Sequence, residues 1–143
     1  PDLVPSAGPL TRKKPSASEA RDIEFGRSVL AATGPFEIGQ TVVVKDGLVF
    51  ALEAVEGTDA AIRRGAELAR GGAVVVKAAK PGQDLRFDVP AIGPETIALM
   101  QEVGVSVLAI EAGRTIILER ETVIVAAEAA AIRILAFPAE KSS

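Results

Sequence analysis

The spacing of apolar residues first predicts a helix over about 18–32. Ser16 and Glu19 have the spacing of a capping box, in which the two residues satisfy each other's free backbone amides at the start of a helix. Apolar side chains then recur at helical intervals until Gly34-Pro35, where the helix is expected to end. The chain is therefore expected to enter its folded part through an amphipathic helix.

Two runs rich in β-branched residues come next, over 40–44 and 48–55. They are separated by the turn Lys45-Asp46-Gly47. An Asp-Gly turn between two such runs is typical of a β-hairpin. This part of the sequence therefore predicts one antiparallel pair of strands.

Helical and strand patterns alternate in the rest of the chain. Three helices are predicted. Ile62 and Ala66 have helical spacing in the first, Pro94 is expected to begin the second, and Val123 and Ala127 have helical spacing in the third. Short apolar runs that predict strands cover 73–76, 106–110, 114–118 and 132–137. This alternation predicts an α/β fold, in which helices pack on a mixed, mostly parallel sheet that includes the antiparallel hairpin.

Proline content and length suggest how the chain is divided. Residues 1–17 hold four prolines and no apolar period, and predict a linker or a strap over the surface. Residues 18–138 are expected to form a single domain, and 139–143 a polar tail. Since Pro1 stands where a nascent chain has Met, the chain is either processed or a piece of a longer one, and another domain is expected before it.

Composition excludes several classes of function. The chain has no His and no Cys, which excludes Ser-His-Asp chemistry, thiol nucleophiles and most zinc sites. The oxygen ligands that remain suit Mg²⁺ or Mn²⁺. A net charge of −3 without a dense basic stripe argues against a nucleic-acid binder. No signal peptide and no apolar run long enough for a membrane span is present.

The segment over 77–96, which reads KAAKPGQDLRFDVPAIGPET, is the first candidate site. It leaves an apolar run and has no hydrophobic period of its own before the next helix. Loops at the carboxyl ends of strands are where open α/β sheets bind ligands. The mixture of cations, acids and an amide suits an anionic substrate held beside a cation, although a solvated surface loop would also be charged. The polar residues of this segment are Lys77, Lys80, Gln83, Asp84, Arg86 and Asp88.

The motif Glu56-Gly57-Thr58-Asp59 is the second candidate site. Thr58 is expected to cap the following helix, with Asp59 in its first turn, where a carboxylate offsets the helix dipole. That interpretation needs no function. Alternatively, Glu56 and Asp59 bracket a glycine bend and share a metal ion near amides that meet a phosphate. Glu111, at another strand end, either joins the same cleft or faces water as a turn carboxylate.

Four blocks together resemble the carboxy-terminal domain of the UDP-2,3-diacylglucosamine pyrophosphatases. They read IGQTVVV over 38–44, EAVEGTDA over 53–60, the segment from Lys77 quoted above, and EAGRTIILERETVI over 111–124. The resemblance extends over roughly residues 20–137, and the blocks follow the order and spacing of the family. It implies a two-domain cytoplasmic enzyme that hydrolyses a diphosphate with a divalent cation, giving UMP and 2,3-diacylglucosamine 1-phosphate in lipid A synthesis.

The resemblance also implies roles for individual residues. Asp88 matches an aspartate essential in the family, and Glu56 and Asp59 match its acidic motif. At Asp84 relatives can carry Glu, so a shared catalytic role and a surface acid both fit. The resulting hypothesis has Asp88 and Asp84 as catalytic acids, and Asp88, Asp59 and Glu56 as ligands of Mg²⁺ or Mn²⁺. The expected substrate-binding residues are Thr58, Lys77, Lys80, Gln83 and Arg86.

Two other classes of function stay open at this point. One is a binding module that grips the nucleotide or the acyl chains while another domain does the chemistry. The other is an interaction domain whose helices pair with a second subunit. Since the implied substrate is a UDP-linked acylated sugar embedded in the inner leaflet, peripheral contact with the inner membrane is a further expectation, and homo-oligomerisation is left open.

Overall fold

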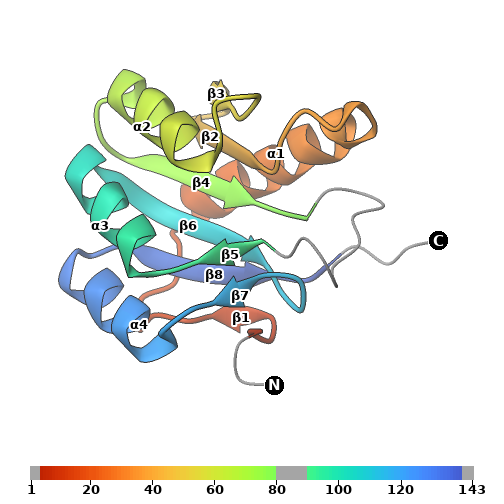
Figure 1. The fold of residues 1–143 in the computed structure, drawn as a ribbon. Coiled ribbons are helices and arrows are strands. Elements are labelled where there is room, and N and C mark those ends of the chain that lie inside the picture. Colours follow the sequence, from red (N-terminus) through yellow and green to blue (C-terminus); the bar gives the residue numbers. More distant parts are fainter. Residues whose placement is uncertain (1–3, 80–89, 140–143) are drawn as a thin grey trace.

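The computed structural model describes residues 4–79 and 90–139. These residues form a sheet with the strand order β1-β8-β6-β4-β2-β3 and a small second sheet of β5 and β7 (Figure 1). The strands are β1 (Gly8–Pro9), β2 (Thr41–Lys45), β3 (Leu48–Leu52), β4 (Ala73–Lys77), β5 (Ala91–Ile92), β6 (Val105–Glu111), β7 (Ile116–Ile117) and β8 (Arg133–Phe137). The helices are α1 (Ala17–Thr33), α2 (Thr58–Ala69), α3 (Pro94–Val103) and α4 (Arg120–Ala129), with a 3-10 turn at Gly34–Phe36.

The strand directions confirm the predicted mixed, mostly parallel sheet. Strands β4, β6 and β8 are parallel neighbours, and β2 pairs antiparallel with both β4 and β3. Strand β3 therefore runs in the same direction as β4, β6 and β8, while β1 and β2 run in the opposite direction. The carboxyl ends of these four strands consequently lie along one edge of the sheet.

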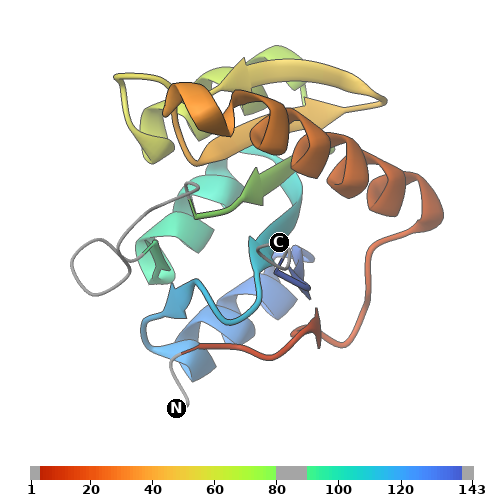
Figure 2. The ribbon, with the colours of Figure 1, turned by 90° about the vertical axis from the view of Figure 1, so that its right-hand side faces the viewer.

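Helices cover both faces of this sheet. Val74 and Val76 of β4 point towards α1, whereas Val75 points towards the layer that holds α2, α3, α4 and the small sheet. All three valines are fully buried, as expected of a central strand with a helix layer on each face. Figure 2 shows α1 on the side of the sheet opposite to α3 and α4. Among the described residues, none of the helices has the length and apolar character needed to cross a membrane.

The capping box at the start of α1 is confirmed. The hydroxyl of Ser16 accepts from the backbone amide of Glu19 at 3.2 Å, and the Glu19 carboxylate accepts from the Ser16 amide at 2.9 Å. Both partners needed for the helix start are thus within four residues of each other. The helix forms where the sequence places it because its first free amides are satisfied locally.

The hairpin is also confirmed, and α1 holds its turn. Asp46 and Gly47 have positive φ angles of 51° and 75°, as the tightest hairpin turns require. The Asp22 carboxylate, 8% exposed on α1, accepts from the Asp46 amide at 3.0 Å and from the Gly47 amide at 2.9 Å. One buried side chain therefore joins the first helix to the β2–β3 turn.

Four features differ from the sequence-based expectations. The segment before α1 contributes β1, which pairs antiparallel with β8, so part of the predicted linker belongs to the sheet. The strand expected over 48–55 ends at Leu52, and β5 and β7 form a small parallel sheet that was not expected. The prediction that Thr58 caps α2 is wrong, because Gly57 is the N-cap residue and Thr58 is already helical.

Candidate functional site

Among the predicted site residues that the structure describes, Lys77 lies deepest in the fold. It ends β4 and is 8% exposed, and its Nζ donates to the carbonyl oxygen of Ala91 at 3.2 Å. Ala91 begins β5, so this hydrogen bond joins the strand before residues 80–89 to the strand after them. Burial lowers the pKa of Lys77, and the negative charges of Glu53 and Asp59 partly oppose that shift. An ammonium group is thus held at the carboxyl edge of the sheet, within the electrostatic influence of two acids.

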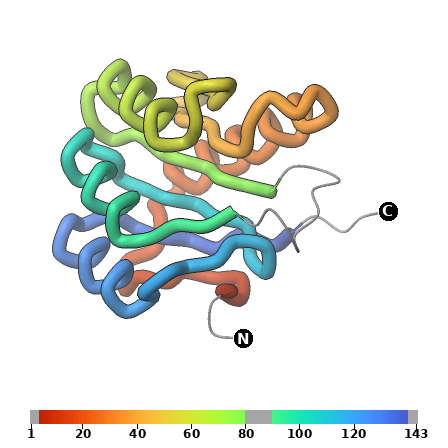
Figure 3. The backbone as a smooth tube through the Cα atoms, viewed as in Figure 1, coloured from red at the N-terminus to blue at the C-terminus, as the bar shows by residue number. Residues whose placement is uncertain are grey.

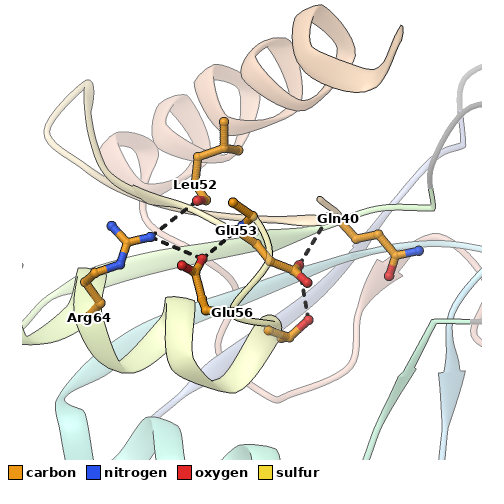
Figure 4. A network of polar contacts seen from close by, with 7 residues as sticks. Gln40, Leu52, Glu53, Glu56 and Arg64 are labelled. Carbon is orange, nitrogen blue, oxygen red and sulfur yellow. Dashed lines mark hydrogen bonds and ion pairs between the residues drawn. The ribbon is translucent and has the colours of Figure 1, made fainter. Parts of the chain in front are cut away.

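Glu53 stands at the centre of a polar network between the end of β3 and the start of α2 (Figure 4). Its Oε1 accepts from the backbone amide of Gln40 at 3.2 Å and from the Thr58 hydroxyl at 3.2 Å. The Thr58 hydroxyl also lies 3.3 Å from the hydroxyl of Thr41, the residue that pairs with Lys77 across β2 and β4. The network therefore runs from the end of β3, through the start of α2, to the strand next to Lys77.

A glycine permits this close arrangement. A Cβ atom on Gly39 would overlap the carbonyl oxygen of Glu53, so only glycine lets the chain enter β2 at this distance from the end of β3. The Glu53 amide then donates to the carbonyl oxygen of Thr41 at 2.8 Å. The two chain segments that carry the network are consequently fixed by backbone contacts as well as by side chains.

Glu56 faces a different group from Glu53. Its Oε1 accepts from the Ala54 amide at 2.9 Å and lies 3.3 Å from Nη2 of Arg64. The Ala54 amide first, and then Arg64, hold the pKa of the exposed Glu56 carboxyl below its usual value. Figure 4 shows the Glu56 carboxylate directed towards Arg64 and the Glu53 carboxylate directed towards Gln40. The role of Glu56 as a metal ligand stays a prediction, and its visible contacts close the turn before α2.

Asp59 lies in the first turn of α2, as the sequence predicts. Its side chain is exposed, and its charge acts on the buried Lys77 ammonium. Asp59 follows Thr58 directly in the sequence, and the Thr58 hydroxyl belongs to the Glu53 network. Of the two acids predicted in this motif, Asp59 is therefore the one with an interaction that reaches Lys77.

The interpretation of Glu111 as a turn carboxylate facing water is wrong. Glu111 ends β6, is 8% exposed, and its Oε1 accepts from the Ala79 amide at 3.1 Å. It lies at the same edge as Lys77, because Lys77 pairs with Ile110 in the parallel β4–β6 register. Its carboxylate thereby holds the chain at the point where it leaves β4 for residues 80–89.

Thr115 is a further buried polar residue at this edge. Its side chain is fully buried, and within the part of the chain that the structure describes its hydroxyl has no hydrogen-bond partner. The next residue, Ile116, donates its amide to the carbonyl oxygen of Pro90 at 2.9 Å, which ties this turn to the chain after residues 80–89. Nothing in its sequence context distinguishes this threonine, because the burial of its hydroxyl without a hydrogen bond results from the tertiary fold.

We expect Thr115→Val to stabilise the protein. Valine has nearly the shape of threonine but no hydroxyl, so the cost of burying an unpaired polar group disappears. The free energy of unfolding should rise by about 1 kcal/mol in urea denaturation. Thr115→Ser is the matched control, since it keeps the hydroxyl and loses the methyl group. A valine variant less stable than wild type would mean that the hydroxyl has a partner in solution.

The remaining predicted residues belong to the segment between Ala79 and Pro90. Ala79 is bound by Glu111, and Pro90 is bound by Ile116, so both flanks are fixed at the edge that carries Lys77. Figure 3 shows the ends of β4 and β6 and the start of β5 on the same side of the molecule. The predicted residues that lie outside the described residues are Lys80, Gln83, Asp84, Arg86 and Asp88.

The described residues alone do not form a metal centre. Over 4–79 and 90–139, no group of three or more acids is close enough together to hold an ion. Asp59 offers carboxylate oxygens of the kind that Mg²⁺ and Mn²⁺ prefer, but a complete ligand set needs further acids. The metal hypothesis therefore depends on an acid from residues 80–89.

Comparison with known proteins gives the family. The family model described as "LpxI C-terminal domain" matches residues 6–135. The chain is 42% identical over 129 residues to the UDP-2,3-diacylglucosamine pyrophosphatase LpxI of Caulobacter vibrioides. This alignment covers 85% of the chain and 46% of that relative, so the chain spans less than half of the relative's length. The agreement of the family model and this relative shows that the chain belongs to the LpxI C-terminal domain family.

Proposed function

We propose that this chain is the catalytic C-terminal domain of an enzyme that hydrolyses the diphosphate of UDP-2,3-diacylglucosamine. Support comes from the relative named as a pyrophosphatase of that substrate. The observation that carries the proposal is the buried Lys77 at the carboxyl edge, on which the charges of Glu53 and Asp59 act, with both flanks of residues 80–89 bound at the same edge. The pathway is then lipid A biosynthesis, and the remaining half of the enzyme is a further domain of the same polypeptide.

The reaction is a displacement at phosphorus by water. A new bond forms between the water oxygen and the α-phosphorus of the UDP group, and the bridging P–O bond breaks. UMP carries the water oxygen away, the sugar leaves as 2,3-diacylglucosamine 1-phosphate, and a proton is released. Catalysis of this kind depends mainly on positioning and on stabilising the negative charge of the phosphoryl oxygens.

Lys77 supplies a positive charge for this task. Its ammonium is held by the Ala91 carbonyl in a buried position, where a charge acts on a phosphoryl oxygen more strongly than in water. Lys80, Arg86 and Gln83 are the further groups of the neighbouring segment that we assign to the diphosphate. Thr58 joins them as a hydroxyl at the helix start.

The chain has no His, and the group that we propose as the base is a carboxylate. We assign this role to Asp88, with Asp84 as the second acid of the same segment. Asp88 and Asp59 are the residues that would hold Mg²⁺ or Mn²⁺, which when bound supplies positive charge to the diphosphate oxygens. The metal and its ligands are a proposal that the known chemistry of carboxylate sites supports.

The test is a hydrolysis assay on the complete polypeptide. We expect UMP to be released from UDP-2,3-diacylglucosamine, EDTA to abolish the release, and Mg²⁺ or Mn²⁺ to restore it. In H₂¹⁸O the label should enter UMP and not the lipid phosphate, since water attacks the α-phosphorus. UDP that carries an unacylated sugar is the matched control substrate. Binding of the nucleotide without any UMP release under these conditions would instead favour the binding-module alternative.

A further inference from the structure

We propose that Glu53 is a positioning residue that acts through Lys77, and that its fixed carboxylate keeps the Lys77 ammonium charged for the substrate diphosphate. Glu53 is not among the residues that the sequence or the family motif singles out for a role. The inference rests on the proposed function, since it assigns a duty to Lys77 in that reaction. Its support comes from the register of the sheet, from the anchoring of both side chains, and from the surrounding charges.

The sheet register places the Glu53 network and Lys77 on the same face. Val43 and Val75 both point towards the α2 layer. Thr41 and Lys77 each lie two residues from one of these valines, and side chains two apart on a strand share a face. Thr41 and Lys77 are also direct partners across β2 and β4. The hydroxyl of Thr41 therefore lies beside the Lys77 side chain, and it is in turn 3.3 Å from the Thr58 hydroxyl that Glu53 binds.

Both ends of this arrangement are anchored. The half-buried Glu53 is held by two donors on Oε1 and by the hydrogen bond of its own amide to Thr41. Lys77 is held at the other end by the Ala91 carbonyl. A charged group that is fixed before the substrate arrives loses little entropy when it acts, which is the general advantage of preorganised sites.

Because Lys77 is buried, its ammonium needs a nearby acid to stay charged. Burial favours the neutral amine, which cannot offset charge on a phosphoryl oxygen, and Glu53 is the first of the two acids that oppose this effect. Asp59, the second, is exposed, so solvent and salt screen its charge more. On the neighbouring strand, Glu111 is bound to the Ala79 amide. Glu53 is thus the half-buried acid whose fixed position suits this duty.

The decisive variant is Glu53→Gln in the complete polypeptide. Glutamine keeps an oxygen that accepts from Gln40 and Thr58, so the fold should melt as wild type while the negative charge is lost. We expect kcat for UMP release to fall about tenfold or more, with KM changed little. Glu102→Gln is the matched control, because it removes one carboxylate charge from an exposed ion pair with Arg63, between α2 and α3. Its kcat should stay at the wild-type value.

Two further measurements separate positioning from mere structural support. If Glu53 acts through Lys77, then Glu53→Gln should have little additional effect on kcat/KM in the Lys77→Met background. Independently of turnover, acylation of Lys77 by acetic anhydride, followed by peptide mass spectrometry, should be several-fold faster in Glu53→Gln because more of the amine is neutral. Glu102→Gln should leave that rate unchanged.

The inference would be overturned if Glu53→Gln left both kcat and the Lys77 acylation rate at their wild-type values. The inference would also be overturned if Glu53→Gln lowered kcat/KM by the same factor in the wild-type and Lys77→Met backgrounds. Glu53 would then act independently of Lys77. A wild-type polypeptide that releases no UMP in the same assay would refute the proposed function instead. The acylation rate would still report on the pairing of Glu53 with Lys77 in that case.

Discussion

The Asp88→Ala enzyme is expected to lose UMP release by a factor of at least about 10³ while its melting curve stays near that of wild type. We propose Asp88 as the carboxylate that takes the proton of the attacking water, since the chain has no His and no Cys. Lys77 and Asp59, whose charge acts on the Lys77 ammonium, would stay in place. Initial rates of UMP release and differential scanning fluorimetry measure the two effects.

Asp84→Ala is the matched comparison, because it removes the other acid of the same segment. We expect a smaller loss of activity than for Asp88→Ala, with an unchanged melting curve. Asp88→Asn tests the charge alone and should be as inactive as the alanine variant. An Asp88→Ala enzyme that folds and turns over like wild type would remove this residue from the reaction and would leave the assignment of the base without support.

Replacing Asp22 by alanine is expected to have the largest effect on stability. The two oxygens of this buried carboxylate accept from the amides of Asp46 and Gly47, and alanine would leave both donors without that partner. Hydrogen bonds to charged groups are stronger than neutral ones, and an unsatisfied buried donor has its own cost. The free energy of unfolding should fall by about 2–4 kcal/mol in urea denaturation.

Two variants control for this prediction. Asp22→Asn keeps one accepting oxygen and should therefore lie between the alanine variant and wild type. Glu24→Ala removes an exposed acid from the same helix, where its partner is Arg27, and should change stability little. If Asp22→Ala had the same midpoint of urea unfolding as wild type, water would be replacing the carboxylate at the turn amides. The link between α1 and the hairpin would then be weak.

Local signals account for the parts of the fold that the sequence predicted well. Ser16 and Glu19 satisfy helix amides within one turn, Asp46 and Gly47 adopt the positive φ angles of a hairpin turn, and Pro94 begins α3 as expected. In each case the residues that decide the conformation are adjacent in the chain. Such features are predictable because no distant contact is needed to favour them.

The features that were missed depend on distant partners. Strands β1 and β5 have two residues each, which is too short for any alternation of apolar and polar positions, and the strand predicted over 114–118 is the two-residue β7, whose pairing with β5 was not expected. They exist because β8 and the chain around Pro90 offer backbone groups at the right place. At Gly57, a positive φ of 91° lets the chain turn into α2 one residue earlier than a threonine cap predicts.

The candidate site was predictable by region and not by residue. Lys77 could be recognised because it ends a continuous apolar run. Glu53 and Glu56 are the same residue type three positions apart, and the end of β3 at Leu52 decides which of their charges acts on Lys77. Residue type and spacing give the chemistry available to a site, whereas the direction of each side chain follows from where the strand stops.

The place of β8 in the sheet has a consequence for how the protein is made. This strand is the last along the chain, yet it lies between β1 and β6. During synthesis β1 therefore has no partner, and the apolar strand β6 has an open edge, until Arg133–Phe137 has left the ribosome. Pairings between such distant segments form slowly, and open edges invite association with other chains. We expect a nascent chain that stops before β8 to aggregate rather than to form a smaller stable sheet.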